Sequence, residues 1–179
     1  MRRATSDRLL FSLPTPVVAI IPFFCALVGI VLASLPVSLS DGHIPPPLFG
    51  LMCIYFWNLV RPDLVSPGVV FVLGLTEDLL SGSPPGLWTS SFIVTYILID
   101  RQHDVFAGLA GWAAVLGFAV AMLIASISAY GIGWLYYWHQ PPLQPLTLQL
   151  AVSILFYIPV ASFLNWLNRR IVGPMRSDF

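Results

Sequence analysis

Long apolar runs separated by short polar segments are the dominant pattern of this sequence. A helix that crosses a bilayer needs about 17–25 mainly apolar residues, at a rise of about 1.5 Å per residue. The pattern therefore predicts an all-α, polytopic membrane protein with about six transmembrane helices in a single domain, residues 1–179. The expected spans are 16–37, 46–60, 63–80, 85–100, 106–136 and 146–171.

Three of these spans leave alternatives open. The runs 46–60 and 85–100 are short for a full crossing, so each crosses with little tilt, lies in thinned bilayer or enters only part of the way. The run 63–80 has a second plausible start at Ser66 and Pro67, because a serine N-cap followed by a first-turn proline is typical of helix N-termini.

Composition requires the bilayer as the main solvent of this chain. Hydrophobic residues make up 58% and charged residues 9%, with a mean hydropathy of +0.86, whereas soluble domains carry roughly 25% charged residues. The formal net charge of zero gives no electrostatic basis for a nucleic-acid partner. The first apolar run has 22 residues, longer than the roughly 7–15 of a secretory signal, so we expect a retained span.

The distribution of arginine predicts the orientation. There is no lysine, and with six spans all eight arginines fall on one side, while the segments 38–45, 81–84 and 137–145 on the other side hold none. Cytoplasmic loops are the ones enriched in basic residues. Both termini are therefore expected in the cytoplasm. The arginines are Arg2, Arg3, Arg8, Arg61, Arg101, Arg169, Arg170 and Arg176.

Two adjacent acids, Glu77 and Asp78, interrupt the third apolar run. Ionised groups at membrane depth are costly, so such a pair is by default a candidate functional site. The alternative is that both acids lie near the helix end and reach headgroup water. At helical spacing Asp78 shares a face with Gly74 and Gly82. We expect Asp78 to face protein and accept hydrogen bonds. Hydroxyl donors in the following span are Thr89, Ser90, Ser91 and Thr95.

Residues that carry catalysis or bind metals do not cluster in the sequence. His43, His103 and His139 lie in separate segments without metal-ligand spacing, and none of them is in a span. Cys25 and Cys53 fall inside apolar runs and form no disulfide framework. The sequence therefore predicts a protein that is not an enzyme and that uses no metal or cofactor.

Small residues recur at every fourth position of the fifth run. Ala113, Gly117, Ala121 and Ala125 lead this helix-packing stripe, which continues through Ala129 and Gly133. Small residues at this spacing let membrane helices approach closely. The stripe packs either within this chain or against a helix of another protein.

Two charged turns are expected on the arginine-rich side. They are Arg61-Pro-Asp63 and the segment 100–104. Each is either a solvated turn that signals topology or a docking point for a cytosolic partner.

The segment from Phe56 to Gly86 carries a family resemblance. It contains Arg61-Pro-Asp63 and then Phe71-Val-Leu-Gly74-Leu-Thr-Glu77-Asp78-Leu-Leu-Ser-Gly82-Ser-Pro-Pro-Gly86. This run resembles the bacterial rod shape-determining protein MreD family, which shows Phe-x-x-Gly-Leu-x-x-Asp-x-x-x-Gly-x-x-x-Gly in the same hairpin. Thr76 and Glu77 depart from the apolar residues common there.

The resemblance implies a function and a set of partners. It implies a non-enzymatic inner-membrane scaffold of the cell-elongation machinery, which organises lateral peptidoglycan synthesis beside MreC, MreB, RodA and a penicillin-binding transpeptidase. It also implies a fold similar to the substrate-binding subunits of energy-coupling-factor transporters, and contact with membrane lipid. A small-molecule-binding transporter subunit is the alternative. That function would need a polar pocket lined by Asn58, Glu77, Asp78 and the nearby hydroxyls.

Overall fold

The computed structural model describes residues 15–35, 45–102, 111–138 and 142–172. Within these ranges every regular element is helical, which confirms the predicted all-α class. The helices are α1 (Thr15–Ser34), α2 (Phe49–Val60), α3 (Pro67–Ser81), α4 (Leu87–Arg101), α6 (Trp112–Tyr137) and α7 (Leu143–Leu167); a 3-10 turn, Pro62–Leu64, precedes α3 and a π-helical turn, Asn168–Val172, follows α7.

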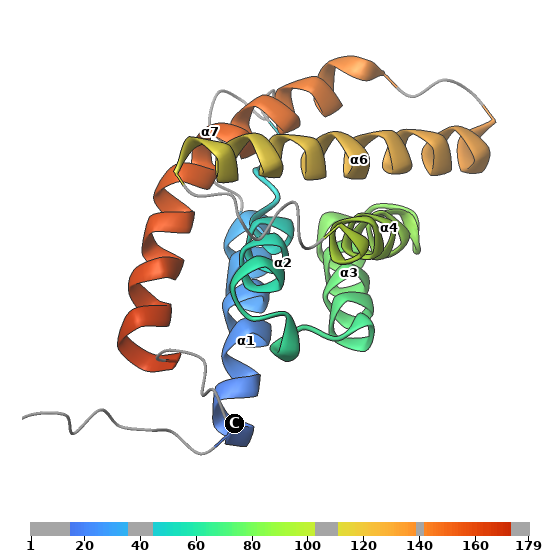
Figure 1. Ribbon diagram of the computed structural model, residues 1–179. Coiled ribbons are helices and arrows are strands. Elements are labelled where there is room, and N and C mark those ends of the chain that lie inside the picture. The colour runs from blue at the N-terminus through green and yellow to red at the C-terminus, as the bar shows by residue number, and fades with distance from the viewer. Residues whose placement is uncertain (1–14, 36–44, 103–110, 139–141, 173–179) are drawn as a thin grey trace, which may run out of the picture.

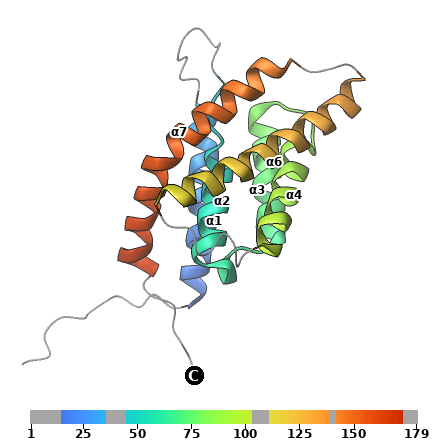
Figure 2. The same ribbon diagram turned by 45° about the horizontal axis from the view of Figure 1, so that its top comes forward.

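Helix α2 forms the centre of the molecule. It has only 12 residues, and Gly50 through Asn58 are all buried. In Figure 1, α1, α2 and α3 lie roughly side by side, and α6 crosses above them at a large angle to α1. Helix α7 begins beside α6, bends, and descends along α1 and α2, as the turned view in Figure 2 also shows. The short second span is therefore a core helix surrounded by its longer neighbours.

Aromatic side chains hold the two longest helices to α2. The rings of Phe118 and Tyr157 are stacked with centroids 4.3 Å apart. Tyr55 meets both rings edge-on, at 5.6 and 5.7 Å, and all three side chains are buried. Such pairs contribute about 0.5–1.5 kcal/mol beyond area burial. This cluster joins α2, α6 and α7 near the middle of the molecule.

The third helix begins at Pro67, four residues later than the predicted start at Asp63. The Ser66 Oγ accepts a hydrogen bond from the Val69 N–H at 3.4 Å, so the alternative start is confirmed. A helix starting at Asp63 would place Pro67 in its interior, where proline removes a backbone hydrogen bond and clashes with the preceding turn. At the first helical position the missing N–H costs nothing.

Within the described residues, each predicted span overlaps one α-helix. The predicted residues 36–37 and 106–110 lie outside the described residues, and α6 begins at Trp112. In the described part of the chain, two helices are long and apolar enough to cross a membrane by length and composition: Trp112–Tyr137, and α7 with the turn that follows it, Leu143–Ile171. Helix α7 contains Pro159, whose missing backbone hydrogen bond accounts for its bend in Figure 1.

Candidate functional site: the hairpin of α3 and α4

Asp78 is the polar centre of the hairpin formed by α3 and α4. Its side chain is only 2% exposed. Oδ1 accepts hydrogen bonds from the Ser83 hydroxyl at 3.0 Å and the Trp88 N–H at 2.7 Å. Oδ2 accepts from the Gly86 N–H at 2.9 Å, the Thr89 N–H at 3.1 Å and the Thr89 hydroxyl at 2.6 Å. Both oxygens are thus fully used within the hairpin.

This arrangement makes Asp78 the N-terminal cap of α4, supplied from the neighbouring helix. The first N–H groups of any helix lack partners within that helix, and a Ser, Thr, Asp or Asn side chain at the N-cap normally accepts from them. The N-cap of α4 is Gly86, which has no side chain to do so. The Asp78 carboxylate takes that place, and its negative charge meets the positive end of the helix dipole.

Gly74 brings the two helices close enough for this contact. A Cβ atom built on Gly74 would lie 2.6 Å from the Thr89 Cα and 3.2 Å from the Thr89 nitrogen. No real Cβ approaches backbone atoms so closely, so only glycine allows α3 to touch the first turn of α4 at this point. Gly74 lies one turn before Asp78 on the same face, and the close approach sets the reach of the carboxylate.

Gly82 and Gly86 form the two ends of the connecting turn. Gly82 is the C-cap of α3 with φ of 66°, and Gly86 is the N-cap of α4 with φ of 98°. L-residues with a side chain rarely adopt such angles, whereas glycine does so at little cost. The four regularly spaced residues therefore act together. Gly74 allows the close approach of the helices, Asp78 caps α4, Gly82 ends α3 and Gly86 begins α4.

Glu77 is buried on a different side of α3. It is 5% exposed, and helical spacing places it with Val70 and Leu73, which are also buried. The interpretation in which the acidic pair reaches headgroup water is therefore wrong, because both acids are buried inside the chain. The Glu77 Oε2 has no hydrogen-bond partner among the described residues.

The hydroxyl-rich segment of α4 contributes less to the site than its sequence suggests. Of the four predicted donors only the Thr89 hydroxyl reaches Asp78. The hydroxyls of Ser90, Ser91 and Thr95 donate to carbonyl oxygens of their own helix. Sequence reasoning missed the three backbone N–H donors and Ser83. A helix start that has glycine in place of a capping residue is the signal that could have revealed them.

The charged turn of Arg61 and Asp63 lies apart from this hairpin. The Arg61 guanidinium donates two hydrogen bonds to the Asp63 carboxylate, at 3.1 and 3.0 Å. These bonds hold the pKa of Asp63 below its ordinary value. Asp78 is eleven residues beyond Pro67, about 16 Å further along α3. The structure therefore does not join the turn to the Asp78 site.

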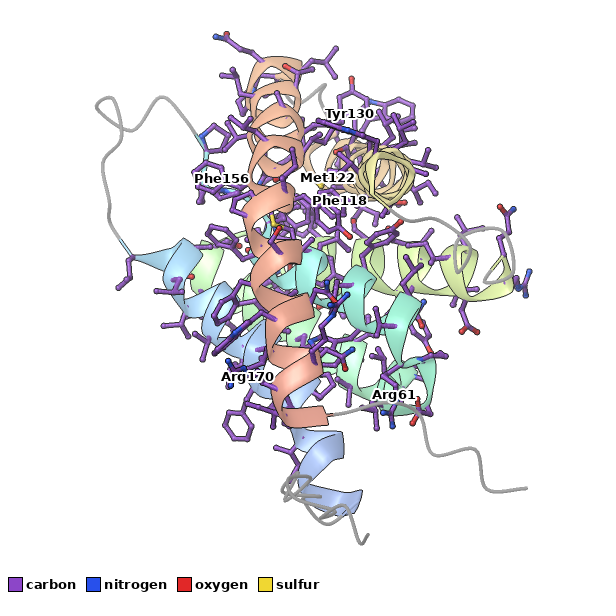
Figure 3. The ribbon with its side chains drawn as sticks, turned by 60° about the vertical axis from the view of Figure 1, so that its left-hand side comes forward. Arg61, Phe118, Met122, Tyr130, Phe156 and Arg170 are labelled. Atoms are coloured by element: carbon purple, nitrogen blue, oxygen red, sulfur yellow. The ribbon has the colours of Figure 1, made fainter. Side chains whose placement is uncertain are left out.

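The small-residue stripe of α6 is directed into the molecule. Gly117, Ala121 and Ala125 are buried, and Ala113 is half-buried. Helix α6 packs mainly against α4 and α7. Phe118 and Met122, labelled in Figure 3, are each 0% exposed. The stripe therefore packs within this chain, and its buried positions are not open to a helix of another protein.

The sequence matches the family described as rod shape-determining protein MreD over residues 15–167. The matched region contains all the described helices except the π-helical turn after α7, and it includes the whole hairpin. No solved structure matches the chain.

Proposed function

The chain belongs to the rod shape-determining protein MreD family, and from this membership we propose that it is a non-enzymatic inner-membrane scaffold of the bacterial cell-elongation machinery. Its role would be to organise lateral peptidoglycan synthesis through helix-to-helix contacts with partner proteins. A role in determining rod shape follows from the family itself. The scaffold mechanism is our proposal and rests on how the polar groups of the motif are used.

The observation that carries the proposal is the complete use of Asp78 within the fold. A general acid or base must have a free position within hydrogen-bond reach of its substrate. Both oxygens of Asp78 instead accept bonds from the hairpin, three of them from backbone N–H groups. The central acid of the motif therefore fixes the angle and spacing of two helices, which is the task of a structural residue.

The outer faces offer the surfaces that a scaffold needs. On α6 the side chains of Trp112, Leu116 and Ile127 are at least 69% exposed, and on α7 Leu155 is 68% exposed. Exposed apolar faces of this extent mark contact with lipid or with other proteins. The family resemblance implies MreC, RodA, MreB and a penicillin-binding transpeptidase as partners, and we propose helix contacts with the membrane-embedded ones.

We propose a multi-pass topology with six spans and both termini in the cytoplasm. Arg61 and Arg170 lie at the same end of the molecule in Figure 3, opposite Tyr130, which supports a single basic side. With 26 residues, α6 is about 39 Å long. A helix of that length can cross a core of about 30 Å with some tilt.

Among the described residues, the cavity beside α2, α6 and α7 does not provide the polar pocket that the transporter-subunit alternative would need. A cavity of about 480 Å³ between α2, α6 and α7 has mostly apolar walls, with Ser162 and Asn165 among its few polar side chains. Asp78 is occupied by the hairpin, and Glu77 and Asn58 do not line this cavity. The scaffold is therefore the better supported function.

Complementation combined with partner recovery tests the proposal. A tagged copy should restore rod shape to rod-forming bacteria that lack their own family member, and detergent purification should recover the elongation proteins in mass spectrometry. Reporters fused after Ser81, after Gln140 and at Phe179 test the topology. We expect exported reporters to be active at the first two sites and a cytoplasmic reporter at the third. Restored shape without any recovered elongation protein would refute the scaffold.

A further inference from the structure

An apolar groove runs between α1 and the lower half of α7, with α2 as its floor. Its volume is about 600 Å³, in the range of small-molecule and lipid sites. The wall on α1 includes Phe24 and Val28, the floor includes Cys53, and the wall on α7 includes Phe156 and Phe163. The lining is almost entirely hydrocarbon, so an occupant must be apolar along the length of the groove.

The length of the groove selects a lipid chain rather than a helix. On α7 the lining extends from Phe156 to Leu167, which is eleven steps or about 16 Å, and on α1 from Phe24 to Leu32, about 12 Å. A transmembrane partner helix would follow the whole core of about 30 Å. The groove covers about half of that, the depth of one leaflet. One acyl chain fits this length.

A basic residue, Arg170, lies near one end of the groove. Phe163 lines the groove and its ring is stacked on Trp166 at 6.0 Å. The Arg170 guanidinium carbon lies 5.9 Å from the centre of the Trp166 ring, an attractive cation–π geometry. The stack therefore leads from the apolar groove to the guanidinium of Arg170, and Arg169 is its neighbour in the sequence. Figure 3 shows Arg170 at the lower end of α7.

In the part of the chain that the structure describes, no acid pairs with Arg169 or Arg170. Within the described residues the one ion pair is that of Arg61 with Asp63. Arg169 and Arg170 are exposed and have no acidic partner in that part of the chain. Guanidinium groups bind phosphate in a bidentate manner, and basic pockets between membrane helices bind anionic head groups. A single ligand would satisfy both features if it carried a phosphate and an acyl chain.

We propose that the groove between α1 and α7 binds one acyl chain of an anionic glycerophospholipid, whose phosphate is held by Arg169 and Arg170. The site selects lipid from the leaflet on the arginine-rich side. It also fills the space between α1 and α7, which contact each other little, and so links the first and last helices of the fold. This inference requires only a membrane environment and is independent of the scaffold role.

Native mass spectrometry of the delipidated full-length protein tests the site. The protein is offered equal amounts of phosphatidylglycerol and phosphatidylethanolamine with identical acyl chains. We expect one phosphatidylglycerol to be retained with a preference of about tenfold or more, because each arginine near the surface favours an anionic lipid. Equal retention of the two lipids would overturn the proposal, and so would a homodimer or a bound protein in place of the lipid.

Matched variants separate the head-group contact from the groove. Arg169→Gln with Arg170→Gln should abolish the preference, whereas Arg101→Gln, on α4 away from the groove, should keep it. Val28→Trp should block binding of both lipids. Val31→Trp is the control, because Val31 is similarly exposed on α1 but does not line the groove. Identical lipid binding by both members of either comparison would contradict the proposed site.

A second measurement does not depend on any variant. Wild-type protein is photolabelled with an anionic phospholipid that carries a diazirine in its acyl chain. We expect labels on groove residues of α1 and α7, such as Val28 and Phe163, and not on Leu116, which is exposed on the outer face of α6. Uniform labelling of all exposed apolar residues would show only bulk lipid contact and would refute a specific site.

Discussion

Replacing Asp78 by alanine should destabilise the fold more than any other single change in the hairpin. The change leaves three buried donors without an acceptor: the Trp88 N–H, the Thr89 N–H and the Thr89 hydroxyl. An unsatisfied buried donor costs about 1–3 kcal/mol, and little water is available at this depth to replace the carboxylate. We therefore expect a loss of about 3 kcal/mol or more in the free energy of unfolding.

Asparagine at position 78 should have an intermediate effect. Because both carboxylate oxygens accept from backbone N–H groups, an amide must turn its NH₂ group toward a donor in either orientation. The better orientation places the NH₂ group at the Oδ1 position. There it loses the Trp88 N–H but keeps the Gly86 and Thr89 donors on the remaining oxygen. Asp78→Asn should cost about 1–2 kcal/mol, roughly one unsatisfied donor.

The measurement is reversible unfolding in mixed micelles by titration with a denaturing detergent, together with rescue of cell shape. A control is Asp100→Ala, since Asp100 is an exposed acid near the other end of α4. The reasoning would be refuted if Asp78→Ala unfolded like the control. If Asp78→Asn abolished shape rescue while unfolding and partner recovery stayed normal, ionisation itself would matter, and a transport or enzymatic role would replace the scaffold.

Three further predictions use other parts of the structure. Gly74→Ala should lower stability by about 1–3 kcal/mol, because the new methyl group meets the backbone of α4, whereas Gly131→Ala, with open space around its Cβ, should be neutral or stabilising in the same unfolding assay. Gly117→Leu should lower the temperature at which the protein loses monodispersity, because the residue is buried between helices; unchanged thermal stability would show that the stripe faces lipid. In an NMR titration, Asp63 should titrate below its ordinary value of 3.8, and Arg61→Gln should raise the midpoint. The small stabilisation from this pair is then present above pH 3.8 and disappears as the pH falls through the depressed pKa.

Hydropathy predicted the order of the helices in the described part of the chain, because long apolar runs are typical of helices in apolar surroundings. The alternative start of α3 at Ser66 and Pro67 was also readable, since capping and first-turn proline are local effects. The predicted start of α3 at Asp63 is wrong, because the apolar run continues through a turn before the helix begins at Pro67. Apolar content reports the environment of a segment, while the dihedral limits of proline report where a helix can begin.

The sequence predicted only part of the Asp78 site, for a related reason. The burial of Asp78 against α4 could be inferred from its face, shared with Gly74. Most of its partners could not, because backbone N–H groups are present at nearly every residue and carry no signature in the sequence. The hydroxyls of Ser91 and Thr95 were predicted as donors to Asp78, but they donate to carbonyl oxygens of their own helix. Such backbone acceptors also have no signature in the sequence. Glu77 and Asp78 are neighbours in sequence, yet they point about 100° apart and meet different surroundings.

The regular spacing of Gly74, Asp78, Gly82 and Gly86 is explained by the geometry of the hairpin. One turn separates the close approach at Gly74 from the cap at Asp78, and Gly82 and Gly86 then provide the two left-handed positions that return the chain to the carboxylate. The two oxygens of Asp78, used in this way, are not free to bind a substrate or a partner. We therefore expect recognition to use surfaces that the described part of the fold leaves open: the outer face of α6, and the groove between α1 and α7 near Arg169 and Arg170, which have no acidic partner among the described residues.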